Sequence, residues 1–146
     1  MHSLVIYASR SGNTRRVAEA IANRLGERGS VDLRSVDEAP TEIEPDIDLL
    51  VIGGPTEAHG MTPPVAEFFD RLPHGALAGR RAVGFDTRLR WPEWLSGSAS
   101  ARITDRLRGL GAKVVAPEES FFVTRKPELE AGELERASSW AASLPA

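Results

Sequence analysis

The sequence predicts an α/β protein in which helices cover both faces of a five-stranded, doubly wound parallel sheet. Short apolar runs with strand character are present at 4–8, 31–36, 48–52, 82–85 and 112–115. Segments with helical periodicity lie between most of these runs. This alternation is typical of a parallel sheet, because neighbouring parallel strands need a crossover connection.

Each helix is expected where apolar residues recur at helical spacing between suitable end residues. The first begins after Asn13 or Thr14, both good caps, and keeps helical spacing until Gly26 provides a stop. Further helices are expected at 65–72, 99–110 and 132–144. The segment 118–123 looks like a split continuation of the fifth strand. In the last helix, Trp140 is expected to pack in the core.

Length and composition limit the kind of protein this can be. The 146 residues are 41% hydrophobic, which suits one compact domain spanning 1–146. The chain has no cysteine for disulfides, thiolate metal sites or nucleophiles, and its three histidines form no ligand-like pair, so we expect no metal. With 18 basic and 21 acidic residues, the formal charge of −3 gives no reason to expect a nucleic-acid partner. No leader and no apolar segment of about 18 residues is present, so we expect a cytoplasmic protein without membrane insertion.

The loop between the first strand and the first helix carries the strongest functional signal. It consists of Ser9, Arg10, Ser11, Gly12, Asn13 and Thr14. In a parallel sheet this loop lies at the carboxyl edge, where the free amides and the positive dipole end of the helix attract anions. The hydroxyl groups add donors, and Gly12 lets the backbone approach a ligand closely. The loop therefore predicts a phosphate site, with an ordinary strand-to-helix turn as the alternative.

Two common nucleotide-binding patterns are missing. The pattern G-x-x-x-x-G-K-S/T does not occur, and no G-x-G-x-x-G follows a strand. A P-loop nucleotide hydrolase and a nicotinamide-binding Rossmann domain are therefore disfavoured.

The six residues from Ser9 to Thr14 resemble the S-x-T/S-G-N-T loop of the flavodoxin family, short-chain type, which binds the phosphate of flavin mononucleotide (FMN). The resemblance extends over nearly the whole chain. It implies a flavodoxin-like sheet with strand order 2-1-3-4-5 and FMN at the switch point of the strand order, as in flavodoxin itself. It also implies a one-electron carrier that binds FMN without a covalent bond and exchanges electrons with redox partner proteins.

The segment 53–64, GGPTEAHGMTPP, resembles the family's second flavin loop, which runs along one side of the isoalloxazine ring. By this resemblance Pro55 belongs to the start of the loop, Thr56 faces the ribityl chain or the phosphate, and Gly60 presents its carbonyl to the flavin N5. Family members often carry an aromatic residue near this point. Here His59 is the nearest planar substitute, and a solvated loop histidine is the alternative.

The segment 86–99 resembles the third flavin loop and contains Thr87, Arg88, Trp91, Trp94 and Gly97. Two tryptophans in a polar segment with a proline do not suit a buried strand, and aromatic faces stack well on a flat ring. By resemblance Trp91 takes the position of the flavin-stacking aromatic, and Trp94 is the second choice. The alternative is that both tryptophans pin the loop onto the core.

Charge is where this chain departs from its relatives. Flavodoxins are typically strongly acidic around the flavin, whereas Arg88 and Arg90 here lie beside the expected stacking tryptophan. A cation near the ring favours the addition of the second electron, because the fully reduced flavin is anionic. We therefore expect a less negative potential for that step than in strongly acidic flavodoxins. Docking of an acidic partner is the alternative role of both arginines.

No residues form recognisable catalytic machinery of their own, so a bound flavin would carry the chemistry. Electron transfer is therefore expected rather than turnover of a dedicated substrate. Two other functions stay open at this point. One is a flavin-dependent reductase of quinone-like or nitro-aromatic acceptors, and the other is a flavodoxin-fold interaction module that binds no flavin.

Overall fold

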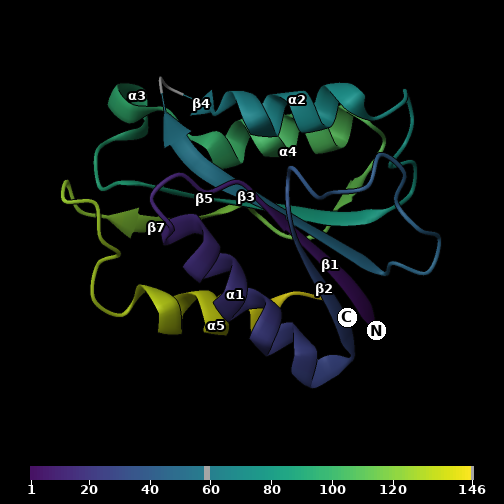
Figure 1. Ribbon diagram of the computed structural model, residues 1–146, viewed down its shortest axis with the longest axis horizontal. Coiled ribbons are helices and arrows are strands. Elements are labelled where there is room, and N and C mark those ends of the chain that lie inside the picture. Colours follow the sequence, from purple (N-terminus) through teal and green to yellow (C-terminus); the bar gives the residue numbers. More distant parts are fainter. Residues whose placement is uncertain (58–59, 146) are drawn as a thin grey trace.

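The computed structural model describes residues 1–57 and 60–145, which form one twisted sheet with helices on both faces (Figure 1). The main path of the sheet has the strand order β2-β1-β3-β5-β6, and all neighbours along it are parallel. Because β5 and β6 are the fourth and fifth strands that follow the predicted pattern, the order 2-1-3-4-5 is confirmed. The short strand β4 pairs antiparallel with β3, and β7 pairs parallel with β5.

The strands are His2–Tyr7 (β1), Ser30–Ser35 (β2), Leu49–Glu57 (β3), Gly60–Met61 (β4), Arg81–Leu89 (β5), Lys113–Val114 (β6) and Glu119–Val123 (β7). Two of them, β3 and β5, extend past their predicted ends at 52 and 85, because the ladder between them continues to Pro55 opposite Thr87. The last strand is split as predicted. Strand β6 pairs with the beginning of β5, and β7 pairs with its end.

The helices are Asn13–Leu25 (α1), Pro63–Arg71 (α2), Glu93–Ser96 (α3), Ala99–Gly109 (α4) and Glu133–Ser143 (α5), with a 3-10 turn, Gly26–Arg28, after α1. The four longer helices lie where the sequence predicts them, whereas the short α3 lies inside a segment expected to be a loop. Helices α1 and α5 cover one face of the sheet, and α2 and α4 cover the other (Figure 1). None of the described helices is long and apolar enough to cross a membrane.

Two apolar cores lie on opposite faces of the sheet, because successive side chains of a strand point in opposite directions. In β1, for example, Val5 belongs to the core under α1 and α5, while Ile6 belongs to the core under α2 and α4. The ring of Trp140 packs edge-on against Phe85 and Phe121, with centroids 6.3 and 5.9 Å away. The prediction that Trp140 packs in the core is therefore confirmed.

Candidate functional site

Three loops meet at the carboxyl edge of the sheet, because the parallel strands β1, β3 and β5 all end there. The first loop joins β1 to α1, the second lies between β3 and α2, and the third joins β5 to α4 and contains α3 (Figure 1). The chain moves outward from β1 in both directions, to β2 on one side and to β3 on the other. Ligands of open α/β sheets bind at such a switch point.

The first loop presents amides that have no partner. Gly12 precedes α1 with a φ of 92°, a conformation that favours glycine, and no atom lies within 4 Å of the place a Cβ would take. The Oγ of Ser9 accepts from the amides of Gly12 and Arg15, at 3.0 and 3.4 Å. Within the described part of the chain, no hydrogen-bond acceptor is paired with the amides of Ser11, Asn13 and Thr14. Free amides at the start of a 13-residue helix form a favourable place for an anion.

Other groups of the first loop anchor it to the rest of the fold. The Oγ1 atoms of Thr14 and Thr87 lie 2.7 Å apart and are buried, so they tie the loop to the end of β5. The side-chain amide of Asn13 donates to the Oγ of Ser11 and to the carbonyl of Pro127, each at 3.2 Å. The loop is thereby held from two sides, while its residues Ser9 and Ser11 are exposed.

The paired glycines that open the second predicted flavin segment are explained by packing inside the fold. A side chain at Gly53 would overlap the ring of Phe85, and one at Gly54 would press against Val65 of α2. Both glycines therefore serve the close approach of neighbouring elements. The predicted planar residue of this loop, His59, lies outside the described residues.

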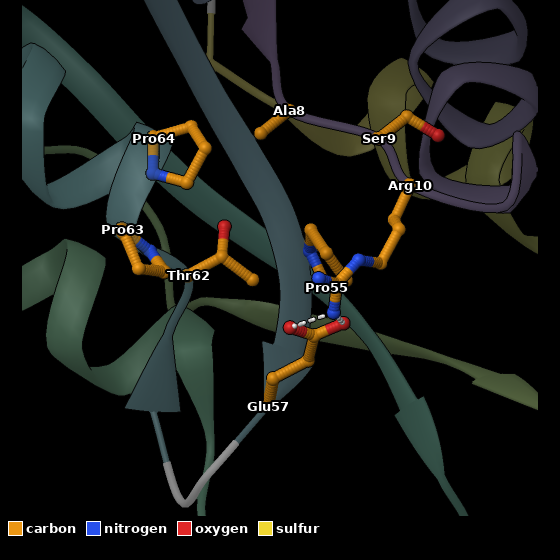
Figure 2. A pocket seen from close by; sticks show the side chains of 8 residues that line it. All are labelled: Ala8, Ser9, Arg10, Pro55, Glu57, Thr62, Pro63 and Pro64. Carbon is orange, nitrogen blue, oxygen red and sulfur yellow. Dashed lines mark hydrogen bonds and ion pairs between the residues drawn. The ribbon is translucent and has the colours of Figure 1, made fainter.

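An ion pair joins the first loop to the second. Both carboxylate oxygens of Glu57 accept from Nη1 of Arg10, at 2.7 and 2.8 Å (Figure 2). Glu57 also pairs with Gly60 in the antiparallel ladder of β3 and β4. Because the two side chains are 77% and 36% exposed, this bridge contributes about 0.2–1 kcal/mol, as exposed pairs do. Arg10 of the first loop is thus engaged by the second loop.

Glu57 of this bridge lines two cavities. The first, of about 300 Å³, is lined by the first loop from Ala8 to Arg10, by Pro55 and Glu57, and by the start of α2 (Figure 2). The second, of about 250 Å³, is lined by Glu57 and Thr56 of the second loop and by residues of the third loop that include Trp91. Because Glu57 lines both cavities, they are adjacent, and together they follow the carboxyl edge from the first loop to the third.

The two tryptophans of the third loop differ in their surroundings. Trp91 lines the second cavity and is 39% exposed, whereas Trp94 on α3 is 83% exposed and does not line that cavity. The alternative that both tryptophans pin the loop onto the core is therefore wrong for Trp94. Gly97 ends α3 with a φ of 72°, which is again a conformation that favours glycine.

The arginines of the third loop point to different partners. Arg88 lines the second cavity, donates from Nη1 to the carbonyl of Trp91 at 2.8 Å, and lies 3.8 Å from the carboxylate of Glu93. Arg90 is not among the residues lining that cavity. It pairs with Glu130 at 2.9 Å, and this hydrogen bond raises the pKa of the Arg90 guanidinium above its ordinary value. Only Arg88 is therefore placed to act on a ligand in the second cavity.

Asp86 is a site residue to which the sequence reasoning assigned no role. Its fully buried carboxylate accepts at Oδ2 from the hydroxyls of Thr56 and Ser98 and from the amide of Ser100, at 2.9 to 3.1 Å. The hydroxyl of Thr56 also accepts the amide of Ala99 at 2.9 Å. These bonds tie the second loop to the start of α4. A lone acidic residue at the end of an apolar strand is the only sequence signal that could have pointed to it.

The arrangement suits a ligand that combines an anionic group with a flat ring. The free amides of the first loop can accept the anion, and the second cavity offers an indole face between two loops. Among the described residues, no group of three or more His, Asp or Glu side chains could hold a metal ion.

The fold and these loops define an α/β protein with a candidate ligand site at the carboxyl edge of a parallel sheet. Residues 4–93 match the family model described as "Flavodoxin domain", so the chain belongs to the flavodoxin family. A curated relative named flavodoxin, from Aquifex aeolicus, is 36% identical over 93 residues. That match covers 60% of this chain and 50% of the relative, so it spans about half the length of the curated protein.

Solved structures share the fold over almost the whole chain. Oxidised Flavodoxin 2 from Bacillus cereus superposes with a TM-score of 0.80 at 23% identity, covering 97% of this chain and 96% of that one. A flavodoxin from Streptococcus pneumonia TIGR4 gives a TM-score of 0.80 at 17% identity, covering 99% and 97% of the two chains. At these identities the likeness shows the fold alone.

Proposed function

We propose that this chain binds FMN non-covalently at the carboxyl edge of its sheet and passes single electrons between redox partner proteins, as one domain. The observation that carries the proposal is the set of first-loop amides that have no partner among the described residues. The same loop lines the first of two adjacent cavities, and Trp91 lines the second. When bound, FMN supplies the redox chemistry at its isoalloxazine ring. Membership of the flavodoxin family supports the choice of FMN and the carrier role.

The first loop is the proposed phosphate site. The amides of Ser11, Asn13 and Thr14 and the hydroxyls of Ser9 and Ser11 are the donors we assign to the phosphate oxygens. The dipole of α1 adds a favourable field for the anion. The buried contact of Thr14 with Thr87 gives the loop a fixed position relative to the sheet. Arg10 can add a positive charge only if it exchanges its contact with Glu57 for the phosphate.

The second and third loops are the proposed ring site. Trp91 is assigned to stack on the ring because its indole lines the cavity between the loops, and Trp94 is the second choice. Thr56, bonded to Asp86, holds the second loop beside that cavity. We assign to Gly60 and Gly97 the role of placing their backbone atoms next to the flavin ring. We keep Pro55 as part of the wall of the first cavity.

Electron transfer to and from partner proteins would take place at the exposed side of the third loop. Trp91, Trp94 and Leu95 are the large apolar side chains that are exposed among the described residues. They lie next to the proposed ring site, where a partner could approach within a distance that permits electron transfer.

The absorption spectrum of purified protein loaded with FMN tests the cofactor, and calorimetry compares FMN with riboflavin, which lacks the phosphate. We expect FMN to bind much more tightly than riboflavin, because the first loop is built for an anion. Equal affinities would overturn the phosphate assignment, and the absence of binding would overturn the function. Turnover of a reduced nicotinamide with a quinone would favour the reductase alternative over a carrier.

A matched pair of glycine variants sharpens this test. Gly12→Ala and Gly75→Ala both place a side chain at a positive φ, of 92° and 71°, and neither new Cβ meets an atom within 4 Å. Each should lose about 1–2 kcal/mol of stability through the same backbone strain. Only Gly12→Ala moves the amides of the first loop, so it alone should reduce the ratio of FMN affinity to riboflavin affinity. An equal effect of both variants on that ratio would count against the phosphate site.

A further inference from the structure

A fourth loop, 124–130 after β7, belongs to the same edge of the sheet. Strand β7 runs parallel to β5 with Val123 opposite Leu89, so the chain leaves both strands side by side. The loop closes on itself, because the amide of Thr124 donates to the carbonyl of Glu128 at 2.7 Å and the Oγ1 of Thr124 accepts the amide of Glu128 at 3.2 Å. It is thus a compact unit next to the third loop.

This fourth loop touches both halves of the proposed FMN site. The carbonyl of Pro127 accepts from Asn13 of the first loop at 3.2 Å. The guanidinium carbon of Arg125 lies 5.3 Å from the centre of the Trp91 ring. That separation is within the range of a cation–π contact. Among the described residues, no carboxylate lies within 4.0 Å of Arg125, so the indole is its one recorded side-chain partner.

Trp91 combines a fixed backbone with a partly exposed indole. The backbone of Trp91 is fixed, because its amide donates to the carbonyl of Leu89 at 2.8 Å and its carbonyl accepts from Arg88 at 2.8 Å. Its indole is 39% exposed and has no aromatic partner among the recorded ring pairs of the described residues. Trp91 lines the second cavity and Arg125 does not, so the guanidinium contacts the indole without forming part of the cavity wall.

We propose that Arg125 is a positioning residue for Trp91, whose indole it packs against so that the ring stays in place to stack on the flavin. This inference rests on the proposed FMN function. The proposal gives the fourth loop two roles. It positions the indole that stacks on the flavin ring, and it binds the first loop through the hydrogen bond from Asn13. The expected ligand contact is made by Trp91, and Arg125 acts through it.

The position of the indole can be tested without any flavin. In a background with Trp94→Phe and Trp140→Phe, Trp91 is the only tryptophan, since the chain has three. We expect Arg125→Ala to increase the quenching of Trp91 fluorescence by acrylamide and to lower its anisotropy, and Arg125→Lys to restore much of the original values. Lys126→Ala removes the neighbouring cation, which has no recorded ring contact, and should change neither value. Unchanged quenching in Arg125→Ala would overturn the positioning role.

The effect on the cofactor is then read from the affinities for FMN and riboflavin. Arg125→Ala should weaken both by the same factor, about two- to fivefold, the range of an exposed cation–π contact. In a Trp91→Leu background the same change should have no effect on either affinity. A loss for FMN alone would mean that Arg125 acts on the phosphate by charge, and would overturn the proposal. If the wild-type chain binds neither flavin, the proposed function fails, and the quenching result still decides whether Arg125 positions the indole.

Discussion

Replacing Arg88 should lower the potential at which bound flavin takes up its second electron. This reduction adds negative charge to the flavin ring. A cation that lines the second cavity, where we propose that the ring binds, therefore favours the reduction. The side chain of Arg88 is 11% exposed, and its Nη2 lies 3.8 Å from the carboxylate of Glu93. The structure therefore presents a charge pair at the cavity in place of the free cation that the sequence suggests.

The size of the effect depends on the separation between each charge and the bound ring, for which we take about 8 Å for Arg88. With Arg88 about 8 Å from the ring centre and an effective dielectric near 20, the attraction is about 2 kcal/mol. A Debye length of about 8 Å reduces it to about 0.8 kcal/mol, or about 30 mV for one electron. Glu93 can lie up to 3.8 Å farther away, which leaves about 0.3 kcal/mol of the opposite sign after screening, or about 10 mV. We therefore expect Arg88→Gln to lower the potential by about 30 mV and Glu93→Gln to raise it by about 10 mV.

A redox titration of wild type and variants at low and high salt measures these shifts. Arg90→Gln is the matched control, because Arg90 pairs with Glu130 and does not line the cavity. Its shift should be smaller than that of Arg88→Gln, and all shifts should shrink at high salt. An unchanged potential in Arg88→Gln at low salt, or an equal shift in Arg90→Gln, would refute this role. If the potential is unchanged in both variants, docking of an acidic partner is the role left for the two arginines.

The remaining predictions concern stability and stacking. Thr14→Ala should lower the free energy of unfolding in urea by about 1–3 kcal/mol, because it leaves the buried hydroxyl of Thr87 without its partner. A decrease no larger than that caused by replacing an exposed serine with alanine would contradict the contact. Trp91→Ala should weaken riboflavin binding by about 0.5–1.5 kcal/mol and relieve flavin quenching more than Trp94→Ala does, and the reverse order would assign the stack to Trp94. The pKa of His2 is raised above 6.5 by hydrogen bonds to two aspartates, so its stabilising effect is present below that pH and is lost as the pH rises through the raised value. His2→Gln should remove this pH-dependent part from urea midpoints measured on both sides of neutrality, and parallel pH profiles of the two proteins would count against it.

The arrangement of the sheet could be predicted from the sequence because strands buried on both faces are apolar throughout, as in 49–52. The ends of β3 and β5 could not. Residues 53–57 contain glycine and proline and 86–89 contain charged side chains, yet both segments continue their strands, and the ladder between them reaches Pro55 opposite Thr87. Their partners lie some 30 residues away, and Phe85 fills the space that Gly53 leaves. Such a distant partner cannot be predicted from the local composition of a segment.

In the candidate site, the first loop could be predicted because its chemistry is local: a helix start with free amides is visible in six consecutive residues. The hydrogen-bond partner of each side chain could not be predicted in the same way. Thr14, expected among the donors to phosphate, has its hydroxyl paired with Thr87 at a separation of 73 residues. Thr56, expected to face the ribityl chain or the phosphate, has its hydroxyl paired with Asp86. A hydroxyl has many possible partners, and tertiary packing decides among them.

The fourth loop shows how the predicted sheet could have been used further. Once 118–123 is taken as a continuation of the last strand, its parallel direction requires that the chain leave it at the carboxyl edge. The loop that follows must then lie among the other loops of that edge, whatever its own sequence. Of those loops, the third is its neighbour, because β7 pairs with β5. The cation at Arg125 is thereby brought to Trp91 by topology, so a search for site residues in a parallel sheet should include the loop after every strand.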